Sequence, residues 1–463
     1  MNSLKCFIIV VVYMLSTIST ATIDKKLVCF WNPMASNRNG RGIFTVKNID
    51  PHLCTHVVYG YFSADSDGTI YQPQFGNVDE YYIYNFVHHR KINPSLQIIA
   101  SIGGPDFPTD NFEKLSSDAS KRVAFAEKIL QFVKDFGFDG VDLYWPYPKG
   151  TDKTNFVKLF VEVSKLLKAD NKSLTISATP NGQNPLNMYE LNAVEKLVDF
   201  VNLDIARMYD IDGMYSYAVP HAPIRSLPYK QNLDMETIIS MWISSGFPLD
   251  KIIPGIPTYG RSYSLKNSYI FGVGAAVIRN GNRGEYGAEN IRKTSILPFN
   301  EICYNLEHNS NWRRLYHAES GSPYAVYDVN QWISFDDIQS VLEKVNFAIN
   351  VKNLGGIAFY DLDMDDFADN CGYGNFPLIN AARREIFNKT DTATEPQPDY
   401  TTPNPEFSCR GRADGNYQNV LNCRTFYTCA NGFRYTMNCP GSLYYHENVD
   451  QCLYKSNNNC VVP

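Results

Sequence analysis

The sequence predicts an α/β fold: a closed (β/α)8 TIM barrel with an α+β insertion, followed by a small disulfide-rich β-type module. Short runs rich in β-branched and aromatic residues recur as far as Leu362, and helix-length segments separate them. Strands that alternate with helices form parallel sheets, and eight such units close into a barrel. Six cysteines lie between residues 409 and 460, a stretch too short to be stable without cross-links. The eight strand-like runs are Leu27–Trp31, Thr55–Phe62, Leu96–Ile102, Phe138–Tyr144, Ser173–Thr179, Phe200–Met208, Ile252–Tyr259 and Gly355–Leu362.

The length of 463 residues exceeds one ordinary core and predicts two folded units. We place the barrel over residues 22–387. The gap between its seventh and eighth runs is too long for one helix, so residues 264–330 are predicted to form an inserted α+β lobe. A net charge of -6 argues against nucleic acid or an anionic membrane as the partner.

The N-terminus has the three parts of a secretory signal, which we place over residues 1–21. Lys5 precedes an apolar stretch, and Ser19-Thr20-Ala21 supplies small residues for cleavage. The apolar stretch is too short to span a bilayer, so we expect a secreted, extracellular protein with no membrane partner. We also expect a monomer. An uncleaved anchor is the alternative. Glycosylation acceptor motifs begin at Asn171 and Asn388.

A clear helix pattern precedes the fourth strand-like run. Over residues 120–136, apolar residues recur at the spacing of one helix face, and Gly137 ends the pattern. The face consists of Val123, Ala126, Leu130 and Val133. In the strand that follows, side chains two apart share a face. We therefore expect positions 142, 144 and 146 to point together into the barrel, at the end where barrel enzymes place their chemistry.

The run Asp139-Gly140-Val141-Asp142-Leu143-Tyr144-Trp145-Pro146 resembles the signature Asp-Gly-x-Asp-x-Asp-x-Glu of the family 18 glycoside hydrolases, the chitinases. Asp139 and Asp142 match, but Tyr144 stands in place of the last Asp and Pro146 in place of the Glu. The resemblance implies that this Glu is the proton donor while the substrate's own N-acetyl group attacks. Loss of a general acid costs ~10²–10⁴ in rate, and a phenol with a pKa of about 10 is a poor substitute for a carboxylate.

Other motifs extend the resemblance over residues 27–386. They are Ser101-Ile102-Gly103-Gly104, Met208-Tyr209-Asp210, Gly255 to Ser262, and Gly355 to Phe367. The resemblance implies that Tyr209 and Asp210 hold the N-acetyl group, although structural hydrogen bonds alone would also retain such a pair. Several cleft tryptophans of the family are replaced, so the cleft could bind chitin weakly, bind another glycan or bind nothing. The predicted sugar-binding residues of the barrel are Tyr59, Tyr209, Asp210, Tyr259, Arg261 and Tyr360.

An acidic run follows the eighth strand. Asp361, Asp363, Asp365 and Asp366 suggest a metal site at first sight. Their alternation, however, is that of a strand end, and the family carries similar residues without metal. We therefore predict no metal and no cofactor.

Residues 388–408 are rich in Thr, Pro, Asp and Glu, which is typical of an extended linker. In the module over residues 409–460, the cysteines leave gaps of 13, 5, 9, 12 and 7 residues. This spacing and Phe426-Tyr427-Thr428-Cys429 resemble the peritrophin-A chitin-binding module, with a generic cysteine-knotted scaffold as the alternative. The expected chitin-binding aromatic residues are Tyr427, Phe433, Tyr435, Tyr444 and Tyr445.

The cysteine count favours disulfides over metal ligands. Of eleven cysteines, Cys6 lies in the predicted signal, which leaves an even ten in an exported chain. Spacing alone does not assign the partners. Resemblance to the two families implies the pairs Cys29–Cys54, Cys303–Cys371, Cys409–Cys429, Cys423–Cys460 and Cys439–Cys452.

Together these features predict a secreted chitinase-like lectin that binds chitin or N-acetylglucosamine oligomers without hydrolysing them. The tail would supply most of the affinity, and a weak barrel site could add avidity. The domain organisation, a barrel followed by a peritrophin-type module, resembles that of the chitinase-like allergens of house dust mites. Two alternatives remain: a weak hydrolase using Asp142 or Asp210 as a displaced acid, and a signalling or growth-factor-like protein whose function survives deletion of residues 401–463.

Overall fold

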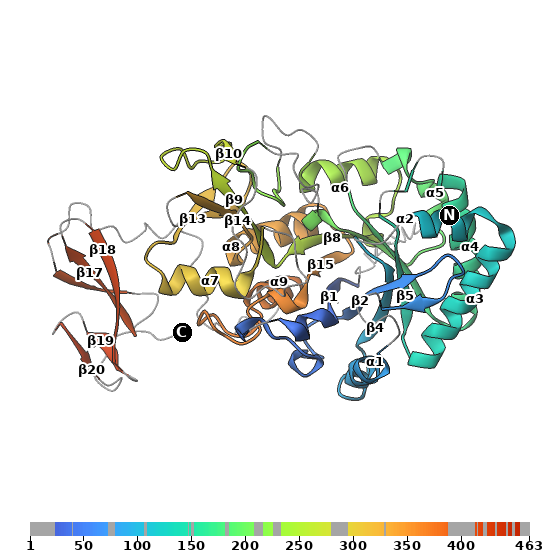
Figure 1. Cartoon of the computed structure of the whole chain (residues 1–463), viewed down its shortest axis with the longest axis horizontal. Coiled ribbons are helices and arrows are strands. Elements are labelled where there is room, and N and C mark those ends of the chain that lie inside the picture. Colours follow the sequence, from blue (N-terminus) through green and yellow to red (C-terminus); the bar gives the residue numbers. More distant parts are fainter. Residues whose placement is uncertain are drawn as a thin grey trace, which may run out of the picture.

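Eight parallel strands close into a barrel, which confirms the predicted fold (Figure 1). Their order is β1-β15-β8-β7-β6-β5-β4-β2, and β1 pairs with β2 to complete the circle. A short strand, β3 (Ile70–Tyr71), extends β2. The barrel strands are β1 (Lys26–Trp31), β2 (His56–Ala64), β4 (Gln97–Gly103), β5 (Gly140–Tyr144), β6 (Ser173–Ala178), β7 (Phe200–Leu203), β8 (Ile252–Pro257) and β15 (Gly356–Tyr360).

This computed structural model describes residues 24–38, 40–72, 79–105, 109–146, 148–149, 152–180, 185–207, 216–225, 233–278, 295–327 and 330–387, and in the C-terminal part residues 413, 415–419, 424–430, 433–440, 443–446 and 450–453. The predicted signal and linker, with Asn388, lie outside the described residues. Asn171 is exposed in the turn between α4 and β6. Within the described ranges, no helix is long and apolar enough to cross a membrane.

Helices connect the strands and pack around the barrel (Figure 1). They are α1 (Glu80–Val87), α2 (Thr109–Ser117), α3 (Ala119–Phe136), α4 (Lys153–Ala169), α5 (Leu191–Val194), α6 (Met235–Ser244), α8 (Ile338–Val345) and α9 (Pro377–Phe387). Single helical turns lie at Pro33–Asn37, Gly40–Gly42, Val46–Asn48, His88–Lys91, Pro185–Asn187, Ile205–Arg207, Leu249–Lys251, Asn346–Val351 and Leu362–Met364.

The helix before β5 begins and ends as its sequence predicts. The Asp118 carboxylate accepts from two backbone N–H groups of the first turn, and Gly137 closes the helix with a left-handed φ of 74°. Ala126 and Val133 of the predicted face are buried and Leu130 packs against the core, but Val123 is 40% exposed. Phe125, Ile129 and Phe132, which were not predicted, widen the buried face. The aromatic residues, which bury the most area, decide which face turns inward.

Two apolar layers stabilise the barrel, one between strands and helices and the other inside the strands. In β5, Val141 and Leu143 belong to the outer layer. Asp142 and Tyr144 point inward and are fully buried. This alternation confirms the predicted orientation of the strand, and it places the Asp142 and Tyr144 side chains inside the barrel.

An α+β lobe is inserted between β8 and β15, as predicted, but it is longer at both ends than residues 264–330. Its mixed-length strands form one sheet in the order β10-β9-β14-β13-β12, with β11 paired to β9. The lobe comprises β9 (Tyr259–Leu265), β10 (Val277–Ile278), β11 (Ile296–Pro298), α7 (Phe299–His308), β12 (Arg313–His317), β13 (Ser322–Tyr327) and β14 (Gln331–Ser334). Tyr259 and Arg261 therefore lie on the first strand of the lobe.

The C-terminal module consists of two antiparallel sheets. The first contains β16 (Gly415–Gln418), β17 (Thr425–Ala430) and β18 (Phe433–Asn438), and the second contains β19 (Tyr444–His446) and β20 (Gln451–Leu453). A disulfide joins Cys439 to Cys452, as the resemblance implied. Cys429 is also disulfide-bonded, while Cys409, Cys423 and Cys460 lie outside the described residues.

Candidate functional site

Asp142 forms the polar centre of the barrel. Its carboxylate accepts hydrogen bonds from the hydroxyls of Ser101, Thr175 and Ser177, each at 2.8 Å, and from the Asn202 amide at 3.2 Å. These donors come from β4, β6 and β7. Burial raises the pKa of Asp142, and the four hydrogen bonds oppose that rise. The arrangement ties four strands together and leaves the carboxyl group deep in the barrel.

Tyr144 lies next along the inward face of β5. Its hydroxyl is 2.6 Å from Thr179 Oγ1 and donates to Asp204 Oδ2 at 2.7 Å. Its ring meets Tyr61 edge to face, with centroids 5.8 Å apart, and the side chain has no exposed surface. The phenol is therefore fixed at both its ring and its hydroxyl.

Pro146 occupies the third position of the predicted inward face, and it is buried. A proline side chain has no proton to donate and no lone pair to accept one, and its backbone lacks an N–H. Trp145, which precedes it, turns outward and stacks on Phe112 at 5.2 Å. The end of β5 thus presents a pyrrolidine ring, which has no proton to donate, and a buried phenol, whose proton is donated to Asp204.

Asp139 lies at the opposite end of the barrel from this site. Its carboxylate accepts from Arg90 at 2.7 Å and from the backbone N–H of Ile98 at 2.8 Å, at the start of β4 and β5. Asp139 therefore holds the bottom of the barrel together. Of the four predicted motif residues, the structure groups Asp142, Tyr144 and Pro146 and separates Asp139 from them.

The predicted role of Tyr59 in the cleft is wrong. Tyr59 packs in the outer layer against Trp31 and Phe86, and its hydroxyl accepts from Gln72 at 2.8 Å. Burial raises its pKa well above the ordinary value. An irregularity in the pairing of β2 with β4 between residues 59 and 62 shifts the alternation, so that Tyr61 points inward instead.

Tyr360 does point into the barrel, as expected for the floor of a cleft. One face of its ring stacks on Phe30 at 4.3 Å, and its edge lies so close to Gly255 that a side chain there would collide with it. Burial raises the pKa of Tyr360 well above its ordinary value. The ring is 0% exposed, so it offers no open face on which a sugar could stack.

The two lobe residues predicted to line the cleft are also buried. The Tyr259 hydroxyl donates to the carbonyl of Ala206 at 2.9 Å, and its ring packs against His221. Tyr259 is 3% and Arg261 5% exposed. Both side chains lie at the junction of barrel and lobe, where they contribute to packing.

Tyr209 and Asp210 lie outside the described residues. The strand predicted to carry them is shorter than expected, because β7 ends at Leu203 and a helical turn follows. The inward polar residues at this place are Asn202 and Asp204, which the sequence analysis did not select. Their spacing of two, directly after a buried apolar run, is the signal that could have identified them.

The acidic residues after β15 have separate partners. Asp363 forms an ion pair with Arg38. Asp365 accepts from backbone N–H groups at the start of α9, and burial raises its pKa to about 7. Asp366 accepts from Asn370 and from the backbone of Cys371.

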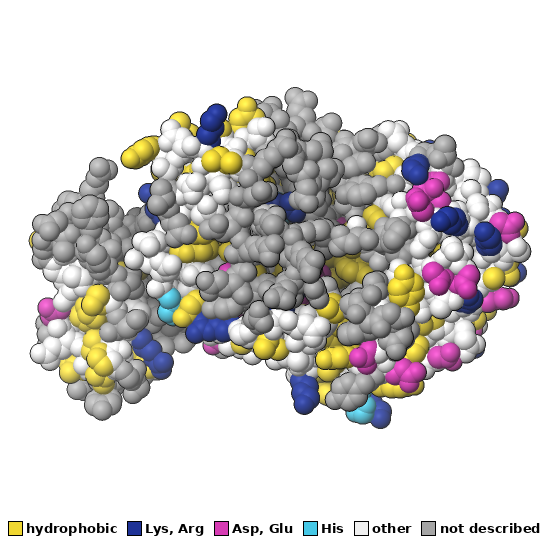
Figure 2. Space-filling model, viewed as in Figure 1, with side chains coloured by type: hydrophobic (Ala, Val, Ile, Leu, Met, Phe, Trp, Pro, Cys, Tyr) yellow, Lys and Arg dark blue, Asp and Glu magenta, His cyan; other side chains and the backbone are white. Residues whose placement is uncertain are grey.

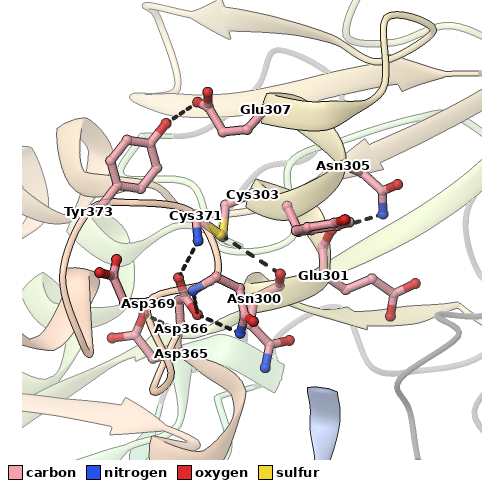
Figure 3. Close-up of a disulfide and its surroundings, with 12 residues drawn as sticks. Asn300, Glu301, Cys303, Asn305, Glu307, Asp365, Asp366, Asp369, Cys371 and Tyr373 are labelled. Atoms are coloured by element: carbon pink, nitrogen blue, oxygen red, sulfur yellow. Dashed lines mark hydrogen bonds between the residues drawn. A yellow bond between two sulfur atoms is a disulfide. The ribbon is translucent and has the colours of Figure 1, made fainter. Parts of the chain in front are cut away.

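A disulfide lies beside Asp366 and joins α7 of the lobe to the loop after β15 (Figure 3). Cys303 and Cys371, with Asp366, form a group whose ligand atoms lie within 4.8 Å of one another. Because the two sulfur atoms are bonded to each other, they are not thiolates that could bind a metal. This disulfide and Cys29–Cys54 both confirm the pairs implied by the resemblance.

In the C-terminal module, the expectation that Tyr445 contacts chitin is wrong. Tyr445 is 1% exposed, its ring stacks on Phe426 at 4.3 Å, and its hydroxyl donates to Asp450 at 2.7 Å. So short a module has little other apolar material, and this pair supplies its core. The stacked rings connect the two small sheets.

Two other aromatic residues of the module remain partly exposed. Tyr427 lies directly across from Tyr417 of β16, a residue that the sequence analysis missed. Tyr444 lies beside Arg424, whose guanidinium carbon is 5.5 Å from the ring centre. The side chains of Phe433 and Tyr435 lie outside the described residues.

A closed parallel barrel with an α+β lobe after its seventh strand, and with polar side chains gathered at the ends of β5, β6 and β7, defines a (β/α)8 barrel protein whose polar site lies at the carboxyl ends of the strands. Residues 26–365 match the model of the Glycosyl hydrolases family 18, and residues 409–460 match the Chitin binding Peritrophin-A domain. The chain belongs to glycosyl hydrolase family 18 and carries a peritrophin-A chitin-binding domain.

Relatives include both chitinases and chitinase-like proteins. Chitotriosidase-1 of Mus musculus is 29% identical, over 93% of this chain and 95% of that protein. The group IV chitinase of Ostrinia furnacalis has a TM-score of 0.73 at 27% identity, over 78% of this chain and 100% of that chain. Human YKL-39, a pseudo-chitinase with retained chitooligosaccharide binding properties, has a TM-score of 0.70 at 29% identity, over 78% of this chain and 99% of that chain.

Proposed function

We propose that this protein is a chitin-binding member of the family that does not hydrolyse chitin. The observation that carries the proposal is the inward face of β5, where Tyr144 and Pro146 occupy the positions of the family's last carboxylates. Glycosidic bond cleavage requires an acid at the leaving oxygen, and its loss removes ~10²–10⁴ in rate. Pro146 has no proton to donate, and the hydroxyl of Tyr144 is buried and hydrogen-bonded to Asp204.

No described carboxyl group is well placed to replace the missing acid. Asp142 is fully buried and accepts four hydrogen bonds. Asp204, also fully buried, accepts from Tyr144. A donor must reach the substrate oxygen within hydrogen-bond distance, and these carboxyl groups contact the barrel interior instead. The arrangement therefore argues against Asp142 and Asp204 as a displaced acid, while Asp210 lies outside the described residues.

Binding is assigned mainly to the C-terminal module. The described tyrosines predicted to bind sugar in the barrel are buried, and only part of the inward Tyr61 is exposed there, whereas Tyr427 and Tyr444 of the module are both partly exposed. An aromatic face must be accessible to stack on a sugar. We propose Tyr427 and Tyr444 as chitin contacts, together with Phe433 and Tyr435 as predicted. YKL-39 supports the combination of lost catalysis with retained oligosaccharide binding.

Disulfides support an extracellular location, since they form and persist in oxidising compartments. Cys29–Cys54, Cys303–Cys371 and Cys439–Cys452 are present. Together with the predicted signal over residues 1–21, they lead us to propose secretion. The monomeric state remains a prediction.

The test compares the full-length protein with a chain that ends at residue 387, both secreted from the same cells. We expect chitin beads to retain the full-length protein and not the shortened one, because the latter lacks the module. The same samples are assayed with a fluorogenic chitotrioside, and neither should release the fluorophore. Retention of the shortened chain would contradict the module assignment. If the full-length protein released the fluorophore and its Asp142→Asn variant did not, the proposed lack of activity would be contradicted.

A further inference from the structure

The insertion lobe contains a cavity that the proposed function does not use. Its volume is about 320 Å³. It lies between the end of β9, the loop after it, and one end of β12, β13 and β14. Ser268, Phe271, Asn311, Arg313 and Tyr327 are among the residues that line it. Figure 2 shows hydrophobic and basic side chains together on the surface of this lobe.

Packing holds the walls of the cavity in place. The Trp332 indole N–H donates to the carbonyl of Phe271 at 3.1 Å and fixes the loop after β9. On the opposite wall, Trp312 stacks on Tyr327 with centroids 4.0 Å apart and planes 11° apart. A cavity with rigid walls costs little ordering when a ligand enters.

Arg313 supplies the charge of the cavity. Its guanidinium carbon lies 4.5 Å from the centre of the Phe271 ring, which holds the cation in place. Among the described residues that line the cavity, none is acidic. Within the described part of the chain, Arg313 forms neither an ion pair nor a hydrogen bond, whereas the adjacent Arg314 binds Asp337 and Gln339. The N–H groups of Arg313 are therefore available to an anion.

The remaining polar side chains suit the hydroxyl groups of a sugar. The hydroxyls of Ser268 and Ser310 and the amide of Asn311 line the cavity. None of these three side chains is hydrogen-bonded to another described residue. The same loop exposes 90% of Tyr269, and an open aromatic ring beside a polar cavity could stack on a neighbouring sugar unit.

We propose that the insertion lobe carries a second saccharide site, which binds one acidic sugar unit. Arg313 binds its carboxylate or sulfate group, since guanidinium matches the paired oxygens of such anions. Ser268, Ser310 and Asn311 bind its hydroxyl groups, and Tyr269 stacks on the adjoining unit. The site is separate from the chitin-binding module, and it does not depend on the chemistry at β5.

The experiment titrates the full-length protein with glucuronate, glucose 6-sulfate and glucose, followed by ligand-observed NMR. We expect at least one acidic sugar to bind about tenfold or more tightly than glucose, because a charge-assisted hydrogen bond has about that effect. Arg313→Gln should remove this preference. Arg384→Gln, an exposed arginine on α9, is the matched control and should leave it unchanged. Tighter binding of glucuronate would indicate a uronic acid as the natural ligand, and tighter binding of glucose 6-sulfate would indicate a sulfated glycan.

Tyr269→Ala gives an independent check. It should weaken binding of a glucuronate-containing disaccharide by about threefold to tenfold and leave binding of glucuronate alone unchanged. Retention on chitin beads should be the same for all variants. The proposal is overturned if no sugar binds, if glucose binds as well as the acidic sugars, if Arg313→Gln keeps the preference, or if a glutamate-rich peptide binds in preference to both acidic sugars.

Discussion

The described tyrosines that were predicted to bind sugar in the barrel are buried, whereas two of those predicted in the C-terminal module are partly exposed. In the barrel, Tyr144 and Tyr360 are fully buried and fill the space inside the strands. In the module, Tyr445 forms the core and its neighbour Tyr444 keeps part of its surface. The residue type is the same in both regions. Whether a ring stabilises the fold or can contact a sugar depends on the surface that its neighbours leave open.

The largest effect is expected inside the barrel. Asp142→Ala removes the acceptor of four buried hydrogen bonds, and we expect a loss of about 3–5 kcal/mol in the free energy of unfolding, since each unsatisfied buried donor costs about 1–3 kcal/mol. Urea unfolding of the full-length protein measures it. Retention on chitin beads at low urea should not change. A loss below about 1 kcal/mol would show that the network does not support the barrel.

The neighbouring tyrosines of β19 sharpen the contrast within the module. Tyr445→Ala should unfold the module, because deletion of a buried aromatic side chain costs about 3–5 kcal/mol. Tyr444→Ala should leave it folded and lower chitin affinity by about tenfold, or about 1.4 kcal/mol. Near-ultraviolet circular dichroism and binding to chitin beads measure the two effects.

Tyr445→Phe is the control for this pair. It loses only the hydrogen bond to Asp450, worth about 0.5–1.5 kcal/mol, and should bind chitin normally. If Tyr445→Ala stayed folded and lost binding, Tyr445 would be a contact residue and the assignment of core and surface would be reversed.

The sequence predicts those features that depend on local pattern. The number of barrel strands, the end of α3 at Gly137, the inward orientation of Asp142 and Tyr144, and the three observed disulfides are as expected, although β7 is shorter than predicted. Helix caps and strand alternation arise from neighbours along the chain. A motif that combines several such neighbours therefore carries information about the fold.

Features that depend on distant partners were not predictable in the same way. Tyr59 shares the outward face of β2 with Val57, and the irregular pairing that follows it turns Tyr61 inward, since one inserted residue reverses the side chains after it. Tyr444 and Tyr445 are adjacent in the sequence, and they are distinguished by distant partners: Tyr445 packs against Phe426 and donates to Asp450, whereas Tyr444 lies beside Arg424. The sugar-binding role predicted for Tyr360 likewise required an exposed ring face. In the structure, Phe30 stacks on one face of that ring.

A pH effect of intermediate size is expected from Asp365. Its pKa rises from 3.8 to about 7 on burial, so the folded protein binds this proton more tightly than the unfolded chain does. The resulting stability is complete below about pH 4 and is lost as the pH rises through about 7. The melting temperature of the unaltered protein should therefore fall between about pH 4 and about pH 7. We expect this fall to be smaller in Asp365→Asn when the melting temperatures of the two proteins are compared over the same pH values. A fall of equal size in the variant would show that other groups cause it.

The smallest effect is expected from restoring the missing acid alone. In Pro146→Glu the new carboxyl group follows Tyr144, which is held by Thr179 and Asp204 and still fills the inward position where the family has a carboxylate. We expect turnover of a fluorogenic chitotrioside to remain at the level of the unaltered protein, because an acid accelerates cleavage only if the sugar can reach it. The double variant Tyr144→Asp with Pro146→Glu removes the ring as well, and any gain should appear there first. Turnover by the single variant would show that a sugar already enters the barrel beside Tyr144, and the contrast between a closed barrel and an open module would then fail.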